Sequence, residues 1–458
     1  MFKRRNWKKT ICMLLSVVCF LSLFPIEVKA TEYWPEAPEV ESPSVILMEM
    51  TTGTVLYEKN STEKNYPASI TKILTTLIAL ENSDLNEVVT FSDEAIDNTI
   101  GSGIARDYGE QMKMEQCLYA IMLASANECA YAVAEHVGGT MENFVAMMNT
   151  KAAELGCTNT HFSNPHGLYE DDHYTCARDM ALIAQAAYEN ETFRIITGTA
   201  RYTIPPTNKH EEETPLQNHN EMLYPWQHMQ YRYEYCTGGK TGYTDIARST
   251  LVTFAEKDGM KLVCVVMRTE SPSQWTDSIN LFNFGFDNFQ IFNVADNETS
   301  YDTSEAIEVG ALNHNKTFVE IDENANIVLP KTTEFTGAAS QITYDEASEN
   351  VVGTITYTYA GKEVGRADIV RTGVEVQGFV FDNQEDITEE KVSTVRINPL
   401  MVLLIILIVA LLVLFIYFIK QFADNYYIIR HNMEVKKYRR EQFRHVKSRK
   451  RRRRKRRR

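Results

Sequence analysis

The sequence has no H-E-x-x-H run and no comparable cluster of histidine and acidic residues. Zinc-dependent peptidases take their metal ligands from closely spaced side chains of this kind. The absence therefore argues against a metal-dependent peptidase, and we expect no metal site.

A disulfide framework is also absent. Of the eight cysteines, Cys12 and Cys19 lie in the apolar N-terminal segment. The other six are scattered without a framework spacing: Cys117, Cys129, Cys157, Cys176, Cys236 and Cys264. Six cysteines allow 15 pairings and the sequence selects none of them. Buried free thiols explain the pattern equally well.

Basic residues are scarce in the body of the chain. Residues 31–399 carry 23 Lys and Arg against 57 Asp and Glu, a net charge near -34. The net charge of the whole chain is only -14 because the remaining basic residues gather at the two ends. Such an acidic body would repel nucleic acid, so we expect no nucleic-acid partner.

The N-terminal segment has the features of a secretory signal. Basic residues open the chain, an uncharged apolar run extends from Ile11 to Phe24, and Val28-Lys29-Ala30 offers a cleavage site. We expect residues 1–30 to be a signal peptide. A retained first membrane helix is the alternative, but the apolar run is short for a span.

The C-terminal segment predicts a membrane anchor. No charge occurs from Ile397 to Ile419, and about 20 apolar residues cross a bilayer as a helix. The basic tail, residues 420–458, ends in the unbroken run from Arg449 to Arg458. Positive residues mark the cytoplasmic side, so we expect a single-pass plasma-membrane protein with its body outside the cytoplasm. For the terminal run, we favour binding to anionic lipid over a cytoplasmic partner.

We expect the exported part to form two domains. Residues 44–59 resemble a hairpin around Thr51-Thr52-Gly53, and a second hairpin turns at Lys257-Asp258-Gly259. Between them, helical patterns cover residues 70–80, 116–123, 128–136 and 177–188. We therefore expect an α/β (α+β) catalytic domain over residues 38–292, with an antiparallel sheet and a helical cluster. A small β-rich domain, with a strand at 351–359, should occupy residues 293–390.

One short run combines a nucleophile with a base. Ser69-Ile70-Thr71-Lys72 places a hydroxyl and an amine one helical turn apart on the same face. A lysine with a lowered pKa can take the serine proton, and a helix N-terminus can stabilise an oxyanion. The same spacing occurs at Ser61 and Lys64, but that match lies in a polar turn with no apolar helix behind it.

Two further motifs accompany it. Ser125-Ala126-Asn127 interrupts a helical stretch, although Ser-x-Asn also occurs at Ser278 and Ser348. Lys240-Thr241-Gly242 occurs once and follows Gly238-Gly239, where backbone could approach a ligand. Taken in order, the three motifs form the S-x-x-K, S-x-N and K-T-G set of penicillin-interacting serine enzymes.

The flanking residues make the resemblance specific over roughly residues 40–290. The matching blocks are Tyr66 to Lys72, Ser125 to Glu128, Asn164 to Leu168, Ala177 to Met180 and Lys240 to Thr244. They closely resemble the low-molecular-mass penicillin-binding proteins, the serine D-Ala-D-Ala carboxypeptidases. The resemblance implies a β-lactamase/transpeptidase-like catalytic domain and a role in cell-wall peptidoglycan, and it implies no cofactor.

The resemblance also implies a role for each motif residue. Ser69 would attack the bond between the two terminal D-alanines of a stem peptide, Lys72 would accept its proton, and Ser125 would relay a proton to the leaving D-alanine. Substrate binding would fall to the remaining positions, Asn127, Lys240, Thr241, Gly242 and Tyr243. β-Lactams would acylate the same serine.

Two residues depart from the family pattern: Glu128 stands where Asp is usual, and Arg248 where a small residue is usual. We expect His166 to be an ordered loop residue and Arg178 to be a surface or salt-bridged one. Two other functions stay open. A class A β-lactamase shares the three motifs but needs a positioned Glu that the sequence does not offer, and a non-catalytic wall-binding protein would be expected to lose a motif residue.

Overall fold

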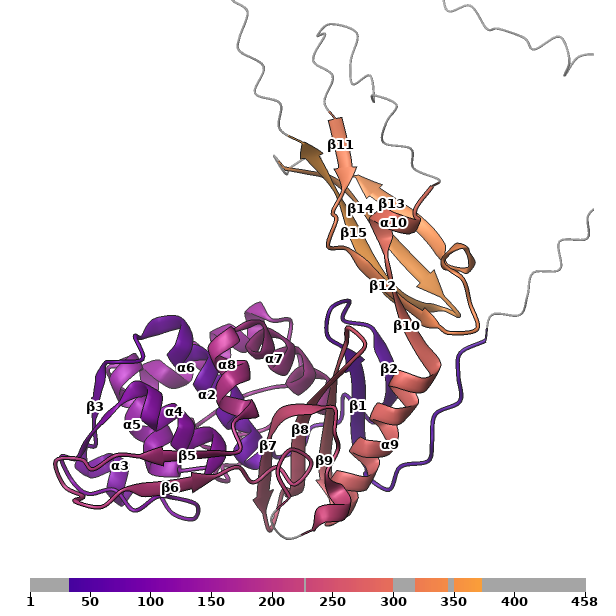
Figure 1. Ribbon diagram of the computed structural model, residues 1–458. Helices are drawn as coiled ribbons and strands as arrows, with labels where there is room; N and C mark the ends of the chain where they lie inside the picture. Colours follow the sequence, from indigo (N-terminus) through magenta and orange to yellow (C-terminus); the bar gives the residue numbers. More distant parts are fainter. Residues whose placement is uncertain (1–32, 226–227, 300–317, 345–349, 373–458) are drawn as a thin grey trace, which may run out of the picture. The chain divides into compact units, whose positions relative to one another are not determined.

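The computed structural model describes residues 33–225, 228–299, 318–344 and 350–372 (Figure 1). A five-stranded antiparallel sheet forms the centre of the first domain. In spatial order its strands are β2 (Val55–Lys59), β1 (Ser44–Glu49), β9 (Met260–Thr269), β8 (Arg248–Lys257) and β7 (Cys236–Thr244). Both predicted hairpins are confirmed, and β7 forms one edge of this sheet.

Helices gather on one side of the sheet (Figure 1). They are α2 (Lys72–Asn82), α4 (Met114–Leu123), α5 (Asn127–Gly138), α6 (Met141–Glu154), α7 (Ala177–Glu189) and α8 (Glu191–Gly198). Helix α2 contacts all the others in this group and is buried along most of its length. The predicted antiparallel sheet with a helical cluster is confirmed, and α2 is its central helix.

The sheet is buried on both faces. Successive side chains of a strand point to opposite faces, so Ile46 and Val265 pack with the helical cluster while Leu47 and Val266 pack on the other side. There α9 (Ser273–Asn288) contacts β1, β8 and β9. Burial on both faces explains why β1, β8 and β9 contain continuous apolar runs rather than alternating ones.

Smaller elements complete the first domain. They are the 3₁₀ turns η1 (Ala68–Thr71) and η2 (Met229–Tyr231), helix α3 (Asp93–Asp97), and the strand pairs β3 (Val88–Thr90) with β4 (Gln111–Lys113) and β5 (Arg201–Ile204) with β6 (Thr214–Gln217). An irregular segment, residues 98–110, connects α3 to β4.

A second antiparallel sheet follows α9. Its strands are β10 (Phe289–Asn293), β12 (Asn326–Pro330), β15 (Lys362–Thr372), β14 (Val351–Tyr359) and β13 (Ala339–Tyr344), with β11 (Phe318–Ile321) also paired to β15. Short helices α10 (Val294–Asn297) and η3 (Phe335–Gly337) accompany them. The predicted strand at 351–359 is confirmed, whereas β10 straddles the predicted domain boundary at residue 293.

Several predicted segments lie outside the described residues: the signal peptide 1–30, the last part of the β-rich domain, the transmembrane helix 397–419 and the tail 420–458. Within the described ranges, no helix combines the length and apolarity needed to span a membrane.

Candidate active site

Ser69 lies in the 3₁₀ turn η1, directly before α2. The turn requires a left-handed backbone at Ala68, whose φ is 51°. Two hydrogen bonds hold the turn, because Thr71 Oγ1 donates to Ala68 O at 2.9 Å and Thr250 Oγ1 donates to Pro67 O at 2.8 Å. The nucleophile is thus presented by a backbone conformation that tertiary contacts stabilise.

His173 supports this turn from behind. Ser163 N donates to His173 Nδ1 at 3.0 Å, so the ring proton lies on Nε2, which donates to Thr71 Oγ1 at 2.9 Å. Burial lowers the pKa of His173 to about 3, and this keeps the ring neutral. The sequence analysis missed this residue, since no motif contains it.

Lys72 is fully buried at the start of α2. Its Nζ lies 3.0 Å from Ser69 Oγ, 2.6 Å from Asn127 Oδ1 and 2.6 Å from the carbonyl oxygen of His166. Burial lowers the pKa of Lys72 well below that of a free lysine, and the charge of Lys240 lowers it further, although Glu128 and Cys129 oppose the shift. Lys72 therefore has the position and the lowered pKa that a base for the Ser69 hydroxyl requires.

The predicted Ser-x-Asn motif forms the turn between α4 and α5. Ser125 has a left-handed backbone, with φ of 62°, and lines the same cavity as Ser69. Asn127 begins α5, where its backbone N–H donates to Ser102 O at 2.9 Å and its side-chain Nδ2 donates to Ile100 O at 2.5 Å. Its side-chain oxygen is thereby fixed toward Lys72.

Strand β7 forms the opposite wall with the Lys-Thr-Gly motif. Lys240 is only 1 % exposed, its Nζ donates to Thr241 O at 2.8 Å, and burial lowers its pKa to about 7. Gly242 lies against the nucleophile turn, whereas the Tyr243 side chain is 58 % exposed. Because β7 is an edge strand, an extended peptide can lie along it.

The motifs meet at one cavity of about 290 Å³. Five of the predicted residues line it, namely Ser69, Ser125, Thr241, Gly242 and Tyr243. The other three, Lys72, Asn127 and Lys240, are buried. Lining residues that the sequence analysis missed include Ser102, His219, Gln274 and Trp275. A larger groove of about 710 Å³ along α2 and α6 contains none of the predicted site residues.

The segment Asn164-Pro165-His166-Gly167 packs closely against the turn that carries Ser69. Gly167 has φ of +87°, and a Cβ there would collide with the Ala68 carbonyl. Burial and the charge of Lys72 lower the pKa of His166 to about 3, and its backbone oxygen, not its ring, contacts Lys72. The expectation that His166 is an ordered loop residue is confirmed. Arg178 forms the expected salt bridge, with Glu58 at 2.6 Å.

The second S-x-x-K match forms no such site. Ser61 donates to Glu58 Oε2 at 2.5 Å, and Lys64 lies 4.0 Å from the centre of the Tyr174 ring. The two side chains thus engage separate partners, as their position in a polar turn suggested.

The two departures from the family pattern have different surroundings. The carboxylate of Glu128 is buried and accepts Ile104 N at 2.5 Å. The guanidinium of Arg248 pairs with Glu270 through two hydrogen bonds of 2.7 and 2.5 Å and does not line the cavity. Only Glu128 therefore belongs to the inner structure of the site.

Comparison with known proteins gives the family. The family model for D-alanyl-D-alanine carboxypeptidases matches residues 31–271. D-alanyl-D-alanine carboxypeptidase DacF of Bacillus subtilis is 36 % identical over 257 residues, which cover 55 % of this chain and 63 % of that protein. DacB2 of Mycobacterium tuberculosis is 33 % identical over 258 residues, 54 % of this chain and 84 % of that protein.

Solved structures agree with this assignment. The D-alanyl-D-alanine carboxypeptidase of M. tuberculosis has a TM-score of 0.51 and 32 % identity, covering 55 % of this chain and 94 % of that one. The Streptomyces K15 DD-transpeptidase has a TM-score of 0.51 and 29 % identity, covering 55 % of this chain and all of that one. The predicted α/β transpeptidase-like fold is confirmed, and the chain belongs to the D-alanyl-D-alanine carboxypeptidase family of serine peptidases.

Proposed function

We propose that this protein removes the terminal D-alanine from peptidoglycan stem peptides through an acyl-enzyme on Ser69. The supporting observation is the buried Lys72 amine, 3.0 Å from Ser69 Oγ, beside a cavity lined by Thr241 and Gly242 of strand β7, in which the neighbouring Lys240 is buried. One lysine can act as a base because it is buried, and the other can attract a terminal carboxylate.

Acylation follows from this geometry. Neutral Lys72 takes the proton of Ser69, and Ser69 Oγ attacks the carbonyl carbon of the penultimate D-alanine. The backbone N–H groups of Ser69 and Tyr243 would stabilise the resulting oxyanion. The C–N bond then breaks, a proton reaches the leaving amine by way of Ser125, and free D-alanine departs.

Deacylation completes the cycle. A water molecule attacks the ester carbonyl, and Ser69 regains its proton as the shortened peptide leaves. A β-lactam presents a strained amide beside a carboxylate, as the D-Ala-D-Ala terminus does, so we infer that it acylates the same serine.

One incubation tests the activity. The soluble ectodomain, residues 31–399, is mixed with a pentapeptide ending in D-Ala-D-Ala, and the products are measured by mass. A tetrapeptide and free D-alanine are expected. Mainly cross-linked dimers in the presence of an acceptor amine would instead assign a transpeptidase, and rapid hydrolysis of benzylpenicillin would assign a β-lactamase.

We further propose that the protein acts outside the plasma membrane, anchored by residues 397–419 with its basic tail inside. The acidic body and the segregation of basic residues to the ends support this topology. Protease added to intact protoplasts should digest the body while an epitope fused after Arg458 stays protected. Loss of the epitope without lysis would contradict the topology.

A further inference from the structure

The irregular segment 98–110 forms part of the wall of the active site. Ser102 lines the cavity, and its carbonyl accepts the N–H of Asn127. The carbonyl of Ile100 accepts Asn127 Nδ2. Asn127 is thus held by this segment on one side and bonds Lys72 on the other. The placement of the segment therefore decides the placement of Asn127.

A second tether joins the segment to α5. Ile104 N donates to Glu128 Oε1 at 2.5 Å, and a Cβ on Gly103 would lie 2.7 Å from Glu128 Oε2. The segment therefore passes directly over the Glu128 carboxylate. A longer acidic side chain than the usual Asp at this position reaches the backbone of the segment.

The segment has little apolar support of its own. From residue 98 to 110 the only buried residues are Arg106 and Glu110. Ile100 is 74 % exposed and Tyr108 is 50 % exposed. Apart from Ile104, which packs against the helical core, the segment is therefore held by polar contacts.

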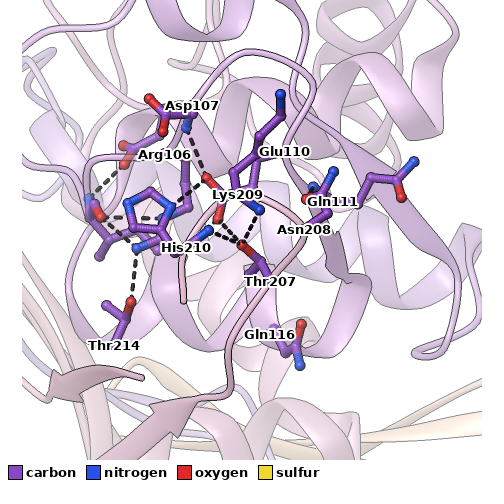
Figure 2. Close-up of polar contacts among 12 residues, drawn as sticks. Arg106, Asp107, Glu110, Gln111, Gln116, Thr207, Asn208, Lys209, His210 and Thr214 are labelled. Atoms are coloured by element: carbon purple, nitrogen blue, oxygen red, sulfur yellow. Dashed lines mark hydrogen bonds and ion pairs between the residues drawn. The ribbon is translucent and has the colours of Figure 1, made fainter. Parts of the chain in front are cut away.

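Those contacts centre on Glu110 (Figure 2). Arg106 Nη1 lies 2.8 Å from Glu110 Oε1, and both side chains are at most 2 % exposed. Arg106 also donates from Nε and Nη2 to the carbonyl of Ile104, the residue whose N–H bonds Glu128. Glu110 Oε2 accepts the N–H of Asp107 at 2.8 Å. Through Arg106, Glu110 is therefore linked to Ile104, whose N–H bonds Glu128 of α5.

The β5–β6 hairpin supplies the other half of the network, as Figure 2 shows. Thr207 Oγ1 donates to Glu110 Oε1 at 2.8 Å, and His210 Nδ1 lies 3.1 Å from Glu110 Oε2. Thr214 Oγ1 accepts from Arg106 Nη2 at 2.9 Å. A hairpin about 100 residues further along the chain therefore clamps the active-site segment.

We propose that Glu110 is a positioning residue for acylation: with Arg106 and His210 it fixes segment 98–110, and through that segment it fixes Asn127 against Lys72. Removing the buried carboxylate leaves the Arg106 charge buried without its partner, which strongly disfavours the present arrangement. The inference rests on the proposed function, because its principal readout is acylation of Ser69.

The test compares variants of the whole ectodomain. Glu110→Ala should lower the second-order rate of acylation by a labelled penicillin about tenfold, since small displacements of catalytic groups have effects of this size or larger. Glu110→Gln, which keeps an acceptor oxygen, should recover part of the rate. The loss should fall on the acylation step and not on initial binding of the penicillin.

Hydrogen exchange gives an independent readout. The amide of Ile104 should exchange faster in Glu110→Ala, because the carbonyl of the same residue loses its fixed Arg106 partner. Lys209→Ala is the matched control, since Lys209 is exposed on the same hairpin turn. Thr140→Ala removes the N-cap of α6 away from the site and controls for general destabilisation. Neither control should change acylation.

Acylation at the wild-type rate by Glu110→Ala would overturn the proposal, and so would a slow rate without faster exchange at Ile104. If Glu110→Ala does not fold, His210→Ala removes one partly exposed arm of the clamp, and an unchanged acylation rate would again overturn it. Wild-type protein that is not acylated would count against the proposed function, while faster exchange at Ile104 would still report the clamp.

Discussion

Gly242 lies so close to Ser69 that a Cβ atom on Gly242 would be 2.8 Å from the backbone nitrogen of Ser69. The same atom would lie 3.1 Å from the Ala68 Cβ. Strand β7 therefore runs against the nucleophile turn with no space for a side chain. This contact joins two motifs that are about 170 residues apart in the sequence.

Gly242→Ala should therefore lower acylation strongly while the protein still folds. Because one obstructing atom belongs to the backbone of Ser69, the turn or the strand must shift, and we expect at least a tenfold loss of kcat/KM. Gly259→Ala is the control, since a Cβ on Gly259 would meet open space, and this residue lies in the β8–β9 turn at a positive φ. That control should lose some thermal stability and keep its kcat/KM.

A labelled penicillin should react with Ser69 and with no other serine. The label should disappear in Ser69→Ala and persist in Ser61→Ala, because Ser61 is hydrogen-bonded to Glu58 and not to a lysine. Peptide mapping after proteolysis locates the label. Undiminished labelling of Ser69→Ala would contradict the assignment of the nucleophile.

The free enzyme should lose kcat/KM as the pH rises through about 7. Burial lowers the pKa of Lys240 to about 7, so its ammonium is present below this pH and is lost above it. A carboxylate substrate needs the charged form. Lys240→Arg keeps its charge at all accessible pH values. The decrease of kcat/KM at alkaline pH should therefore vanish in this variant, even if its maximal rate is lower. If kcat/KM of this variant still decreases as in the wild type above pH 7, Lys240 is not the group that causes the decrease.

His173 should make the folded protein sensitive to acid. Its pKa is lowered from 6.5 to about 3 by burial, so the unfolded chain binds a proton in this range that the folded protein does not. The contribution of neutral His173 to the free energy of unfolding is therefore fully present above pH 6.5 and decreases as the pH falls toward 3. His166 has the same shift, and each should contribute a slope of about 1.4 kcal/mol per pH unit.

His173→Gln should reduce that slope by about one proton, as measured by urea unfolding at several pH values. The variant should also be less stable at pH 7, by about 1–3 kcal/mol, if Ser163 N or Thr71 Oγ1 loses its partner. An identical pH slope in variant and wild type would mean that His173 takes up its proton equally in both states.

The sequence by itself determined the chemical groups of the site. The spacing of Ser69 and Lys72 predicts one helical turn, and the hairpins and helix α2 follow from short-range periodicity. These features depend on neighbours within a few residues, so they can be read without the fold. The flanking blocks then predicted the family, which the comparisons confirm.

Only the tertiary structure decided how those groups are held and tuned. The contact of His173 with Thr71 spans 102 residues, and that of His210 with Glu110 spans 100. The lowered pKa of Lys72 depends first on burial by surrounding elements. Neither periodicity nor a motif specifies such contacts, because they arise only when packing brings distant segments together and removes water from the charges between them.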